Sequence, residues 1–403
     1  TKRISHFMYR WWRGICNYCG GIMVNFSLNE EQALVQKTAR GFAIEHLAPG
    51  VIKRDETETF PGEQIKMMGE LGFMGMMIPE EWGGSGMDTI SYVLALEEIA
   101  AVDASAAVVM SVNNSLVCQL MLDCATDAQK EKFLKPLATG KLLGAYSLSE
   151  PQSGSDASNM CTTAQKDGNH YILNGTKNWV TNGISSDVVL VFCITEKGVG
   201  YKGISAFIVE KGTLGFSTGK KEDKLGIRGS DTCELYFENC RIPAENLLGE
   251  EGVGFKIALN TLGGGRIGIA SQALGIARAS LEKSIEYAKE REQFGKPIGT
   301  FGAIQQKLAN MATEVDAARL LIWRAAKLKD KNRPYVKEAS MAKLYASGVA
   351  MKNSTEAVQI YGGVGYMQEY GIERLMRDAK ITQIYEGTSE IQQLVIARDL
   401  LKK

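Results

Sequence analysis

The sequence predicts an α+β multidomain protein with an N-terminal helical domain, a middle antiparallel β domain and a C-terminal four-helix bundle. Three observations predict this order. The chain has 403 residues, enough for two or three domains. Helical periodicity fills its first and last parts. Short β-branched runs, separated by Gly, Asn and Asp, fill the part between them. We expect an N-terminal extension and three domains, with these bounds: 1–25, 26–144, 145–247 and 248–403.

The overall composition argues against several functional classes. The chain is 45% hydrophobic and 23% charged, as in ordinary globular proteins, and its 46 basic side chains balance its 46 acidic ones. This balance gives no support for a nucleic-acid partner, and no apolar run looks long enough for an integral membrane protein. Eight irregularly spaced cysteines favour a reducing compartment over a disulfide framework. Because the chain has only three histidines, we expect neither a histidine base nor a bound metal.

The extension, residues 1–25, is basic and contains no acidic residue. Its charge is typical of a mitochondrial transit peptide, although it is poor in serine, and it lacks the long apolar middle of a secretory signal. It is also compatible with upstream sequence that precedes a natural start at Met23. Cys16 and Cys19 form a CxxC pair, but no second pair lies nearby to complete a tetrahedral metal site. An unstructured tail is therefore favoured over metal binding.

The N-terminal domain begins with a predicted helix. Ser27 and Glu30 fit a capping box, and Pro49 ends the helical run. The periodic positions of this helix are Leu34, Thr38, Phe42 and Leu47. Further along, SAAVVMSVNNSLVCQLML (105–122) is rich in small and apolar side chains and lies in a region without Lys or Arg. This stretch predicts either a plain core helix or a wall suited to an aliphatic ligand.

The middle domain contains runs that are typical of strands. They cover residues 170–183, 187–195, 203–212 and 233–242. Two motifs in this domain match functional signatures without their structural context. GVGYKG (198–203) matches the dinucleotide fingerprint, but a strand follows it rather than a helix, so we predict a hairpin loop. GFSTG (215–219) matches the nucleophile elbow, but no histidine follows it in the chain, so we reject a hydrolase site.

The C-terminal domain shows the strongest helical periodicity. One apolar stripe is formed by Ile267, Ala270, Leu274, Ala277, Leu281, Ile285 and Ala288. A second stripe is formed by Ile304, Leu308, Met311, Val315, Ala318, Ile322 and Ala325. Pro334 separates this second helix from an Ala-rich third one. Small side chains permit close packing within or between chains, and the helices together predict a bundle.

The stretch IYEGTSEIQQ (384–393) contains the strongest candidate for catalysis. The helical pattern before it stops near Gly387, and Ser389 with Gln392 fits a capping box for the next helix. Glu386, at this joint, would gain proton affinity from the helix C-terminus and from burial, which suits a general base. Gly387 would let backbone N–H groups approach a carbonyl oxygen and stabilise a developing enolate. The alternative is a helix–turn–helix with a surface glutamate.

Seven motifs in order, from about Phe26 to the C-terminus, resemble the acyl-CoA dehydrogenase family. They are YSLSEPQSGSD (146–156), NGTKNWVTNG (174–183), ENLLGEEGVGF (245–255), GGGRIGIASQALG (263–275), REQFGKPI (291–298), AVQIYGGVGY (357–366) and MRDAKITQIYEGTSEIQ (376–392). The resemblance implies an enzyme of fatty acid β-oxidation that binds FAD between the β domain and the C-terminal helices. It would remove a proton from Cα of an acyl-CoA and transfer a hydride from Cβ to flavin N5, giving trans-2-enoyl-CoA.

The resemblance also assigns roles to residues. Glu386 would be the base, and its backbone N–H would hold the thioester oxygen together with an FAD hydroxyl. The implied FAD contacts are Tyr146, Leu148, Ser149, Ser155, Trp179, Thr181, Arg291, Phe294, Gln359, Gly362, Gly363, Thr388 and Glu390. The implied substrate contacts are Ser155, Arg266, Tyr385 and Gly387. Some FAD contacts would reach across a subunit interface of a homotetramer, and electrons would pass to an electron-transfer flavoprotein. Singly, each residue also has a plain structural explanation, such as a core position for Trp179.

Differences between branches of the family narrow the implied substrate. Some long-chain and isovaleryl enzymes place the base just before the arginine that matches Arg266, where this chain has Gly265. Glutaryl-type enzymes carry an arginine where this chain has Ala107. A straight, uncharged acyl chain is therefore favoured, and the overall resemblance is greatest to short-chain, butyryl-type members. Gly263 and Gly302 depart from the family pattern, which leaves one CoA contact and one FAD contact in question.

Other functions remain open at the level of sequence. They are an enoyl-CoA reductase running in the reverse direction, a branched short-chain acyl-CoA dehydrogenase, an acyl-CoA oxidase and a non-catalytic acyl-CoA- or flavin-binding protein. Glu386 argues against the last, because a glutamine there would have favoured it. The resemblance implies a cytoplasmic protein if the source is bacterial and a mitochondrial matrix protein if it is eukaryotic.

Overall fold

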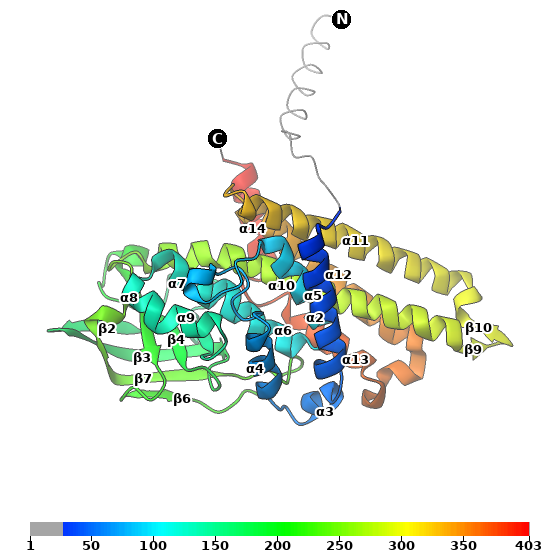
Figure 1. Ribbon diagram of the computed structural model, residues 1–403, viewed down its shortest axis with the longest axis horizontal. Coiled ribbons are helices and arrows are strands. Elements are labelled where there is room, and N and C mark those ends of the chain that lie inside the picture. The colour runs from blue at the N-terminus through cyan, green and yellow to red at the C-terminus, as the bar shows by residue number, and fades with distance from the viewer. Residues whose placement is uncertain (1–26, 403) are drawn as a thin grey trace, which may run out of the picture.

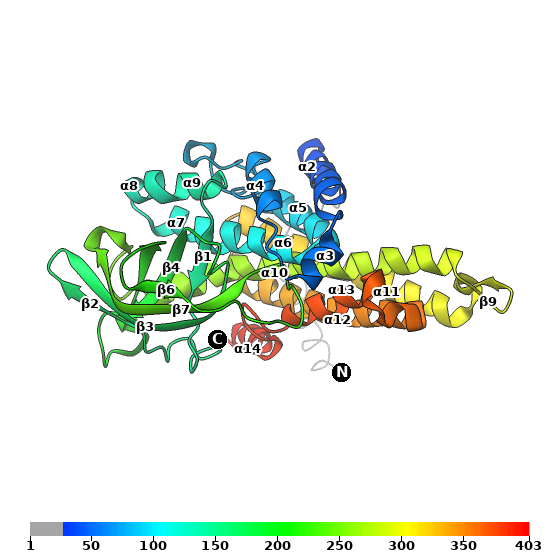
Figure 2. The ribbon, with the colours of Figure 1, turned by 90° about the horizontal axis from the view of Figure 1, so that it is seen from below.

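The computed structural model describes residues 27–402 of the chain. The expectations for Met23 and for the Cys16–Cys19 pair lie outside this range. Within it, helices come first, a sheet follows and long helices complete the chain, which confirms the predicted fold class (Figure 1). The sheet occupies one end of the molecule, and a small hairpin projects from the far end of the long helices (Figure 2).

The N-terminal part is a cluster of short helices with π-helical segments between them. Its α-helices are α2 (Glu30–Phe42), α3 (Val51–Glu56), α4 (Gly62–Glu70), α5 (Thr89–Val102), α6 (Ala104–Ser111), α7 (Gln119–Cys124), α8 (Asp127–Gln129) and α9 (Lys135–Ala138). The π-helical segments are η1 (Ala43–Leu47), η3 (Val112–Cys118) and η4 (Lys130–Leu134). Helices as short as α3 and α4 depend on tertiary packing, since isolated helices of this length are not stable in water.

The start of α2 differs from the prediction. The N-cap is Asn29, whose side chain accepts the Gln32 N–H at 2.7 Å, while the Gln32 side chain accepts the Asn29 N–H at 3.1 Å. The capping box therefore uses Asn29 and Gln32 rather than Ser27 and Glu30. The inward face agrees only in part with the prediction, because Phe42 and Leu47 are buried but Leu34 and Thr38 are exposed. The buried positions of this helix are Gln32, Val35, Ala39 and Phe42, a set with closer helical spacing than the predicted one.

The run Ala104–Cys124 is longer and more apolar than we expected. It forms one continuous helical stretch of 21 residues with a mean hydropathy of 1.4, which by length and composition alone would suffice to cross a membrane. Of its most apolar window, 89% is buried inside the protein. The packing against neighbouring helices accounts for this composition, because core helices are apolar on all sides.

The middle part is a sheet of eight strands. These are β1 (Gly144–Ser147), β2 (Thr163–Asp167), β3 (His170–Thr181), β4 (Val188–Ile194), β5 (Ile204–Glu210), β6 (Phe216–Thr218), β7 (Thr232–Pro243) and β8 (Leu247–Leu248). The order is β6-β7-β3-β2-β4-β5-β8, with β1 paired to β4. The pairing is mainly antiparallel, but β4 is parallel to β1 and touches β2 in parallel.

The two misleading motifs of this part take the forms we predicted. GVGYKG (198–203) lies between the antiparallel strands β4 and β5 and contains one short 3-10 turn, so it is a hairpin loop. GFSTG (215–219) contains β6, and no helix follows it before β7. Neither segment has the strand–turn–helix geometry that the corresponding catalytic or binding sites need.

The C-terminal part consists of three long helices and two short ones. They are α10 (Gly254–Glu290), α11 (Gly302–Asp330), α12 (Val336–Tyr361), α13 (Ile372–Ile381) and α14 (Ser389–Leu400), and the hairpin β9 (Glu292–Gln293) and β10 (Lys296–Pro297) joins the first two. Both predicted apolar stripes face the core, which they share with the N-terminal helices. The central helix, α10, packs against α5, α11 and α12. Its middle is buried on every side, since helices from both helical parts surround it.

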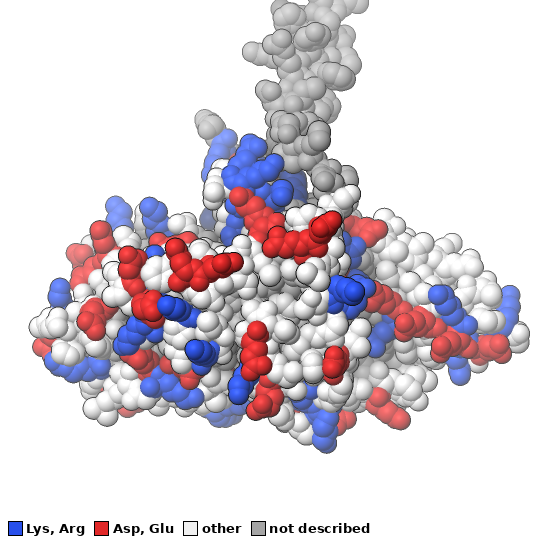
Figure 3. All heavy atoms as spheres, in the orientation of Figure 1, with Lys and Arg blue, Asp and Glu red and all other residues white. Residues whose placement is uncertain are grey.

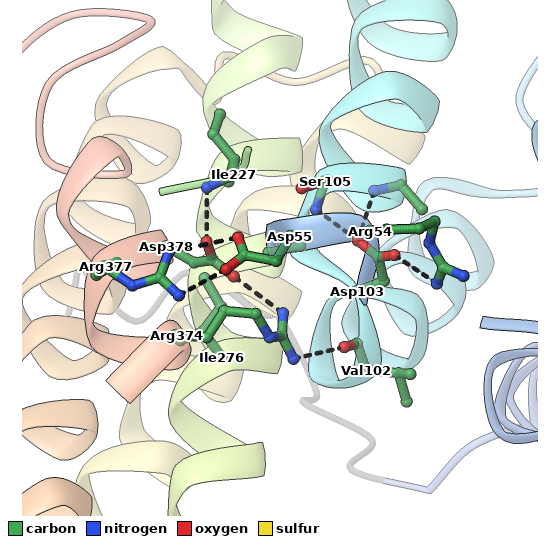
Figure 4. A network of polar contacts seen from close by, with 12 residues as sticks. Arg54, Asp55, Val102, Asp103, Ser105, Ile227, Ile276, Arg374, Arg377 and Asp378 are labelled. Carbon is green, nitrogen blue, oxygen red and sulfur yellow. Dashed lines mark hydrogen bonds and ion pairs between the residues drawn. The ribbon is translucent and has the colours of Figure 1, made fainter. Parts of the chain in front are cut away.

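A network of buried charges joins the three parts close to α13 (Figure 4). Asp378 of α13 accepts the N–H of Ile227, which belongs to the segment between β6 and β7, at 2.6 Å. Asp378 also pairs with Arg374 at 3.0 Å, and Arg374 donates to the carbonyl of Val102 at the end of α5. Arg377 pairs with Asp55 at the end of α3 at 2.6 Å. These contacts anchor α13 to the sheet and to the N-terminal helices. On the face shown in Figure 3, acidic and basic side chains are interspersed, as the neutral balance suggests.

Candidate active site

Glu386 lies in the turn between α13 and α14, and this turn is longer than we predicted. The helix α13 ends at Ile381 instead of continuing to Gly387. At this end the backbone forms i→i+3 hydrogen bonds of the 3-10 type, including one from the Ile384 N–H to the Ile381 carbonyl at 2.9 Å. The following helix is also capped differently: Thr388 is the N-cap, whereas we predicted a capping box of Ser389 with Gln392.

The backbone of this turn is left-handed at two successive residues. Glu386 has φ +52° and Gly387 has φ +93°. Glycine adopts this conformation freely, but a glutamate in it is strained by about 1–3 kcal/mol and needs surrounding contacts to hold it. Among residues 27–402, no acceptor is bonded to the backbone N–H of Glu386. The turn therefore presents a free N–H donor beside the carboxylate.

The Glu386 carboxylate occupies an enclosed position. The residue as a whole is half-buried, but its Oε2 atom is shielded from solvent and has no hydrogen-bond partner in the described part of the chain. Burial raises the pKa of Glu386 to about 7, against the opposing positive charges of Lys343 and Arg266. Because α13 ends well before Glu386, desolvation and not the helix dipole is the cause of this shift.

Gly265 makes the space that the carboxylate occupies. A Cβ atom built on Gly265 of α10 would lie 2.1 Å from Glu386 Oε2 and 2.8 Å from Leu116 Cδ2. Contacts this short are not tolerated between fixed atoms, so a side chain at 265 and the present carboxylate position exclude each other. Leu116 belongs to the apolar stretch 105–122, which is thus both a core helix and, at this point, part of the wall around Glu386.

Two cations and a tyrosine surround the turn. Arg266 is 6% exposed, and its Nη1 donates to the Ser340 hydroxyl at 3.2 Å. Lys343 of α12 is fully buried and donates to the Gly387 carbonyl at 2.7 Å. The hydroxyl of Tyr385 donates to the Gln272 side-chain carbonyl. Burial, followed by the nearby Glu386 charge, raises the pKa of Tyr385, so this tyrosine stays neutral.

The sheet carries further predicted residues, and one of them, Tyr146, is affected by the charge of Glu386. The hydroxyl of Tyr146 on β1 is buried and has no partner among the described residues. Burial raises the pKa of Tyr146, and the charge of Glu386 adds to the effect, which indicates that the two groups lie near each other. Trp179 of β3 has φ +59° and is 62% exposed, so it is not a core residue. Thr181 follows it at the end of the same strand.

A buried ion pair fixes the loop that carries Leu148 and Ser149. Lys177 donates to Glu150 at 2.8 Å and to the Leu148 carbonyl at 3.1 Å, and both charged side chains are almost fully buried. The Ser149 carbonyl accepts the N–H of Asn178 at 2.9 Å. Burial alone would raise the pKa of Glu150, but the Lys177 charge and several hydrogen bonds lower it to about 2.

Two of the predicted FAD contacts lie far from Glu386 within one chain. Arg291 and Phe294 belong to the β9–β10 hairpin at the far end of the long helices (Figures 1 and 2), and Phe294 is 94% exposed. Exposed positions are also taken by Gln359, Gly362, Gly363, Ser155 and Glu390. Thr388 caps α14 next to the turn. The two departures from the family pattern leave room: a Cβ at Gly302 would meet no described atom within 4 Å, and one at Gly263 would touch Tyr335 at 3.4 Å.

The sequence interpretation missed several residues that shape the site. Lys343, Gln272 and Leu116 were not singled out, and Gln392 was assigned to a capping box. In the structure Gln392 is fully buried, and its amide donates to the carbonyls of Glu386 and Gly387 at 3.2 and 2.9 Å. A signal for Lys343 existed, because a lysine between small residues in ASMAKLYASG stands where a bundle helix should bury apolar side chains.

Comparisons with known proteins agree with this architecture. The family models for the N-terminal, middle and C-terminal domains of acyl-CoA dehydrogenases match residues 29–141, 145–240 and 252–401. The chain is 50% identical over 374 residues to an acyl-CoA dehydrogenase of Bacillus subtilis, covering 93% of this chain and 99% of the relative. It is 52% identical over 375 residues to the mitochondrial short-chain specific acyl-CoA dehydrogenase of Rattus norvegicus, covering 93% and 91%.

Solved structures give the same result. The butyryl-CoA dehydrogenase from Megasphaera elsdenii superposes with a TM-score of 0.93 at 49% identity, over 94% of this chain and 100% of that one. A chain from a structure of the electron transferring flavoprotein of Acidaminococcus fermentans has a TM-score of 0.93 at 50% identity, over 94% and 100%. With three family models matched in order and half of the residues identical to its relatives, this chain belongs to the acyl-CoA dehydrogenase family.

Proposed function

We propose that this protein catalyses the FAD-dependent α,β-dehydrogenation of short-chain acyl-CoA thioesters to trans-2-enoyl-CoA, with Glu386 as the base. The Glu386 carboxylate carries the proposal: it is enclosed, its Oε2 lacks a partner in the described chain, and its pKa is raised to about 7. A base of this proton affinity is matched to work near neutral pH, since it is partly ionised and still accepts a proton readily. Relatives named short-chain specific and butyryl-CoA dehydrogenase support the substrate class.

The residues around Glu386 account for the handling of the proton. The acyl Cα would lie against the carboxylate, and the free N–H of Glu386 in the left-handed turn would donate to the thioester oxygen. A donor aimed at this oxygen stabilises the negative charge that develops as the α-proton leaves, and one such donor contributes about 10²–10³-fold in rate. Arg266 and Lys343 add positive charge behind the reacting groups. Because Oε2 is shielded from solvent, the carboxylate would take its proton from the acyl Cα rather than from water.

FAD, when bound, supplies the acceptor at N5 for the hydride that leaves Cβ. The residues present fit a flavin ring, because Tyr146 offers a buried hydroxyl that lacks a described partner and Trp179 offers an exposed aromatic face. The Leu148–Ser149 loop and Thr181 would supply further contacts, and the buried Lys177–Glu150 pair keeps that loop in place. A solved relative, PigA with FAD and proline, has a TM-score of 0.91 at 30% identity.

The remaining predicted FAD contacts suit a site completed by a second copy of the chain. Arg291 and Phe294 on the hairpin are exposed, as are Gln359, Gly362 and Gly363, and a large exposed aromatic such as Phe294 gains free energy when another surface covers it. An apolar groove of about 510 Å³ between α11, α12 and α14 offers a further contact surface; it includes Leu321, Leu344, Val349 and Ile396. We propose a homotetramer in which each chain completes the cofactor site of a neighbour.

The uncharged stretch 105–122 favours an uncharged acyl chain, and the names of the relatives favour a short one. Ala107 is fully buried and offers no charge for a distal carboxylate. Ser155 would contact the CoA part, and electrons would leave to an electron-transfer flavoprotein, the class of protein named with one solved relative. A bacterial relative and a mitochondrial relative support a location in the cytoplasm or in the mitochondrial matrix, according to the source.

The substrate class is tested by anaerobic mixing of the purified flavoprotein with butyryl-, hexanoyl-, octanoyl- and isobutyryl-CoA. We expect the flavin absorbance to bleach fastest with butyryl-CoA, and trans-2-butenoyl-CoA to be the product. Bleaching that is fastest with isobutyryl-CoA would favour the branched-chain alternative. No bleaching with any of these thioesters would refute the dehydrogenase proposal. In air, peroxide formed in proportion to turnover would identify an oxidase instead.

A further inference from the structure

The carbonyl side of the catalytic turn is held by two side chains from different helices. Lys343 of α12 donates to the Gly387 carbonyl at 2.7 Å. Gln392 of α14 donates to the same carbonyl at 2.9 Å and to the Glu386 carbonyl at 3.2 Å. With its carbonyls bound by these two side chains, the turn is held in its left-handed conformation, and the Glu386 N–H has no bonded acceptor among residues 27–402. Contacts of this kind are what a strained φ requires in order to persist.

Lys343 is an unusual choice for this bond. Its side chain has no exposed surface, and no carboxylate of residues 27–402 lies within ion-pair distance of its ammonium group. Burial lowers the pKa of Lys343 to about 8, and the charge of Glu386 partly offsets this effect. A buried, unpaired charge is expensive, and a neutral donor such as the amide of Gln392 would serve the carbonyl equally well. The positive charge itself therefore needs an explanation.

The charged groups around Glu386 explain why position 343 carries a positive charge. Two cations stabilise the charged form of Glu386: Arg266 of α10 and Lys343 of α12. The charge of Glu386 in turn raises the pKa of three tyrosines, Tyr385 of the turn, Tyr146 of β1 and Tyr92 of α5. A further carboxylate, Glu390 of α14, acts on Lys343. Burial raises the pKa of all three tyrosines, so they are neutral. Arg266 and Lys343 are thus the two cations that oppose the desolvation of the Glu386 carboxylate.

We propose that Lys343 is a positioning residue for proton abstraction: its ammonium group holds the Gly387 carbonyl, fixes the turn that aims Glu386, and keeps a positive charge behind the base. This inference rests on the proposed function. Lys343 acts through the turn and does not touch the acyl-CoA. Without the ammonium group, the carboxylate would be both less well aimed and harder to ionise.

The test measures the rate of flavin reduction by butyryl-CoA under anaerobic conditions, from about pH 5.5 to about pH 9, for wild type and three variants. They are Lys343→Met, Lys343→Arg and the control Lys380→Met. Lys380 lies at the end of α13 close to the same turn, but it is exposed and bonds only the nearby Gln383 side chain. Flavin content and thermal unfolding, measured for each variant, separate a loss of structure from a loss of positioning.

We expect Lys343→Met to retain flavin, to reduce it about 10- to 100-fold more slowly, and to shift the acidic limb of its pH profile to higher pH. The shift follows because removal of a positive charge favours the protonated carboxyl. The acidic limb of the pH profile of Lys343→Arg should lie where it does in wild type. Lys380→Met should have both the wild-type rate of flavin reduction and the wild-type acidic limb. If Lys343→Met does not fold, Lys343→Gln replaces it in the experiment. Glutamine keeps a donor for the Gly387 carbonyl and removes only the positive charge.

Two results would overturn the inference. One is a neutral variant at 343 with the wild-type rate and pH profile. The other is a Lys343→Met variant whose acidic limb lies at the wild-type pH, together with a Lys343→Arg variant that reduces its flavin as slowly as Lys343→Met does. The residue would then contribute to packing alone. A wild-type protein that is not reduced at any pH would instead refute the proposed function on which the inference depends, so the two failures are distinguishable.

Discussion

Moving the base from position 386 to position 265 tests the geometry of the site. The ideal Cβ position of Gly265 lies 2.1 Å from Glu386 Oε2, so the two residues approach the same space from opposite sides. Glu386→Gly should slow the reaction strongly, and the double variant Glu386→Gly/Gly265→Glu should restore part of the lost rate. The restored carboxylate would start from α10 instead of from the turn, and it would occupy the space that the Glu386 side chain has left.

The expected magnitudes follow from the role of a general base. Loss of such a base costs about 10²–10⁴-fold in rate, and a carboxylate misplaced by about 1 Å costs about 10²-fold. We therefore expect the double variant to regain at least about tenfold over Glu386→Gly without reaching the wild-type rate. The assay is the anaerobic rate of flavin reduction by butyryl-CoA, with flavin content measured for each protein.

The neighbouring glycine provides a matched control. A Cβ on Gly264 would meet only the Ser115 carbonyl at 3.8 Å and Lys329 Nζ at 3.9 Å, so a side chain there fits but points away from Glu386. Glu386→Gly/Gly264→Glu should be as inactive as Glu386→Gly alone. Equal rates for the two double variants would refute the inference that a carboxylate at position 265, unlike one at position 264, reaches the space of the Glu386 carboxylate.

Three further predictions concern the base, the cofactor loop and the assembly. The kcat/KM of the wild-type enzyme should rise with pH through about 7, because the reaction needs the ionised form of Glu386; a flat profile between pH 5.5 and 8.5, from a full titration, would contradict the raised pKa. Lys177→Met should lose about 3–5 kcal/mol of unfolding free energy in urea and retain less FAD, since it leaves the Glu150 carboxylate buried and unpaired; wild-type stability would contradict this. In wild type, the Glu150 contribution is present above about pH 4.5 and should be lost as the pH falls toward 2. Phe294→Ala should weaken FAD retention with little change in the thermal stability of the isolated chain, since Phe294 is exposed; unchanged FAD affinity would argue against a site completed by a neighbouring subunit.

The order of the structural layers was predictable because it depends on periodicity. The apolar stripes from Ile267 and from Ile304 repeat over many turns, so single errors do not change their face. The ends of helices were harder to predict. The start of α2 is capped by Asn29 rather than Ser27, and α13 stops at Ile381. Several capping patterns compete within a few residues, and tertiary contacts decide among them.

The candidate site was predictable in its central residue and less so in its surroundings. Glu386 and Gly387 stand out in the sequence, because a glutamate–glycine pair between two helices is a recognisable joint. Lys343 and Gly265 are far from that joint in the chain, and only the packing of α10 and α12 brings them to it. Their roles depend on distances of a few ångströms, which periodicity does not specify.

The most direct test of the account compares wild type with Glu386→Gln on anaerobic addition of butyryl-CoA. Glutamine keeps the size and polarity of the side chain but cannot accept the α-proton, and Glu238→Gln, on an exposed part of β7, serves as the matched control. We predict rapid bleaching of the flavin band in wild type and in the control, and bleaching at least about 100-fold slower in Glu386→Gln despite normal flavin content. Bleaching of Glu386→Gln at the wild-type rate would show that another group removes the proton.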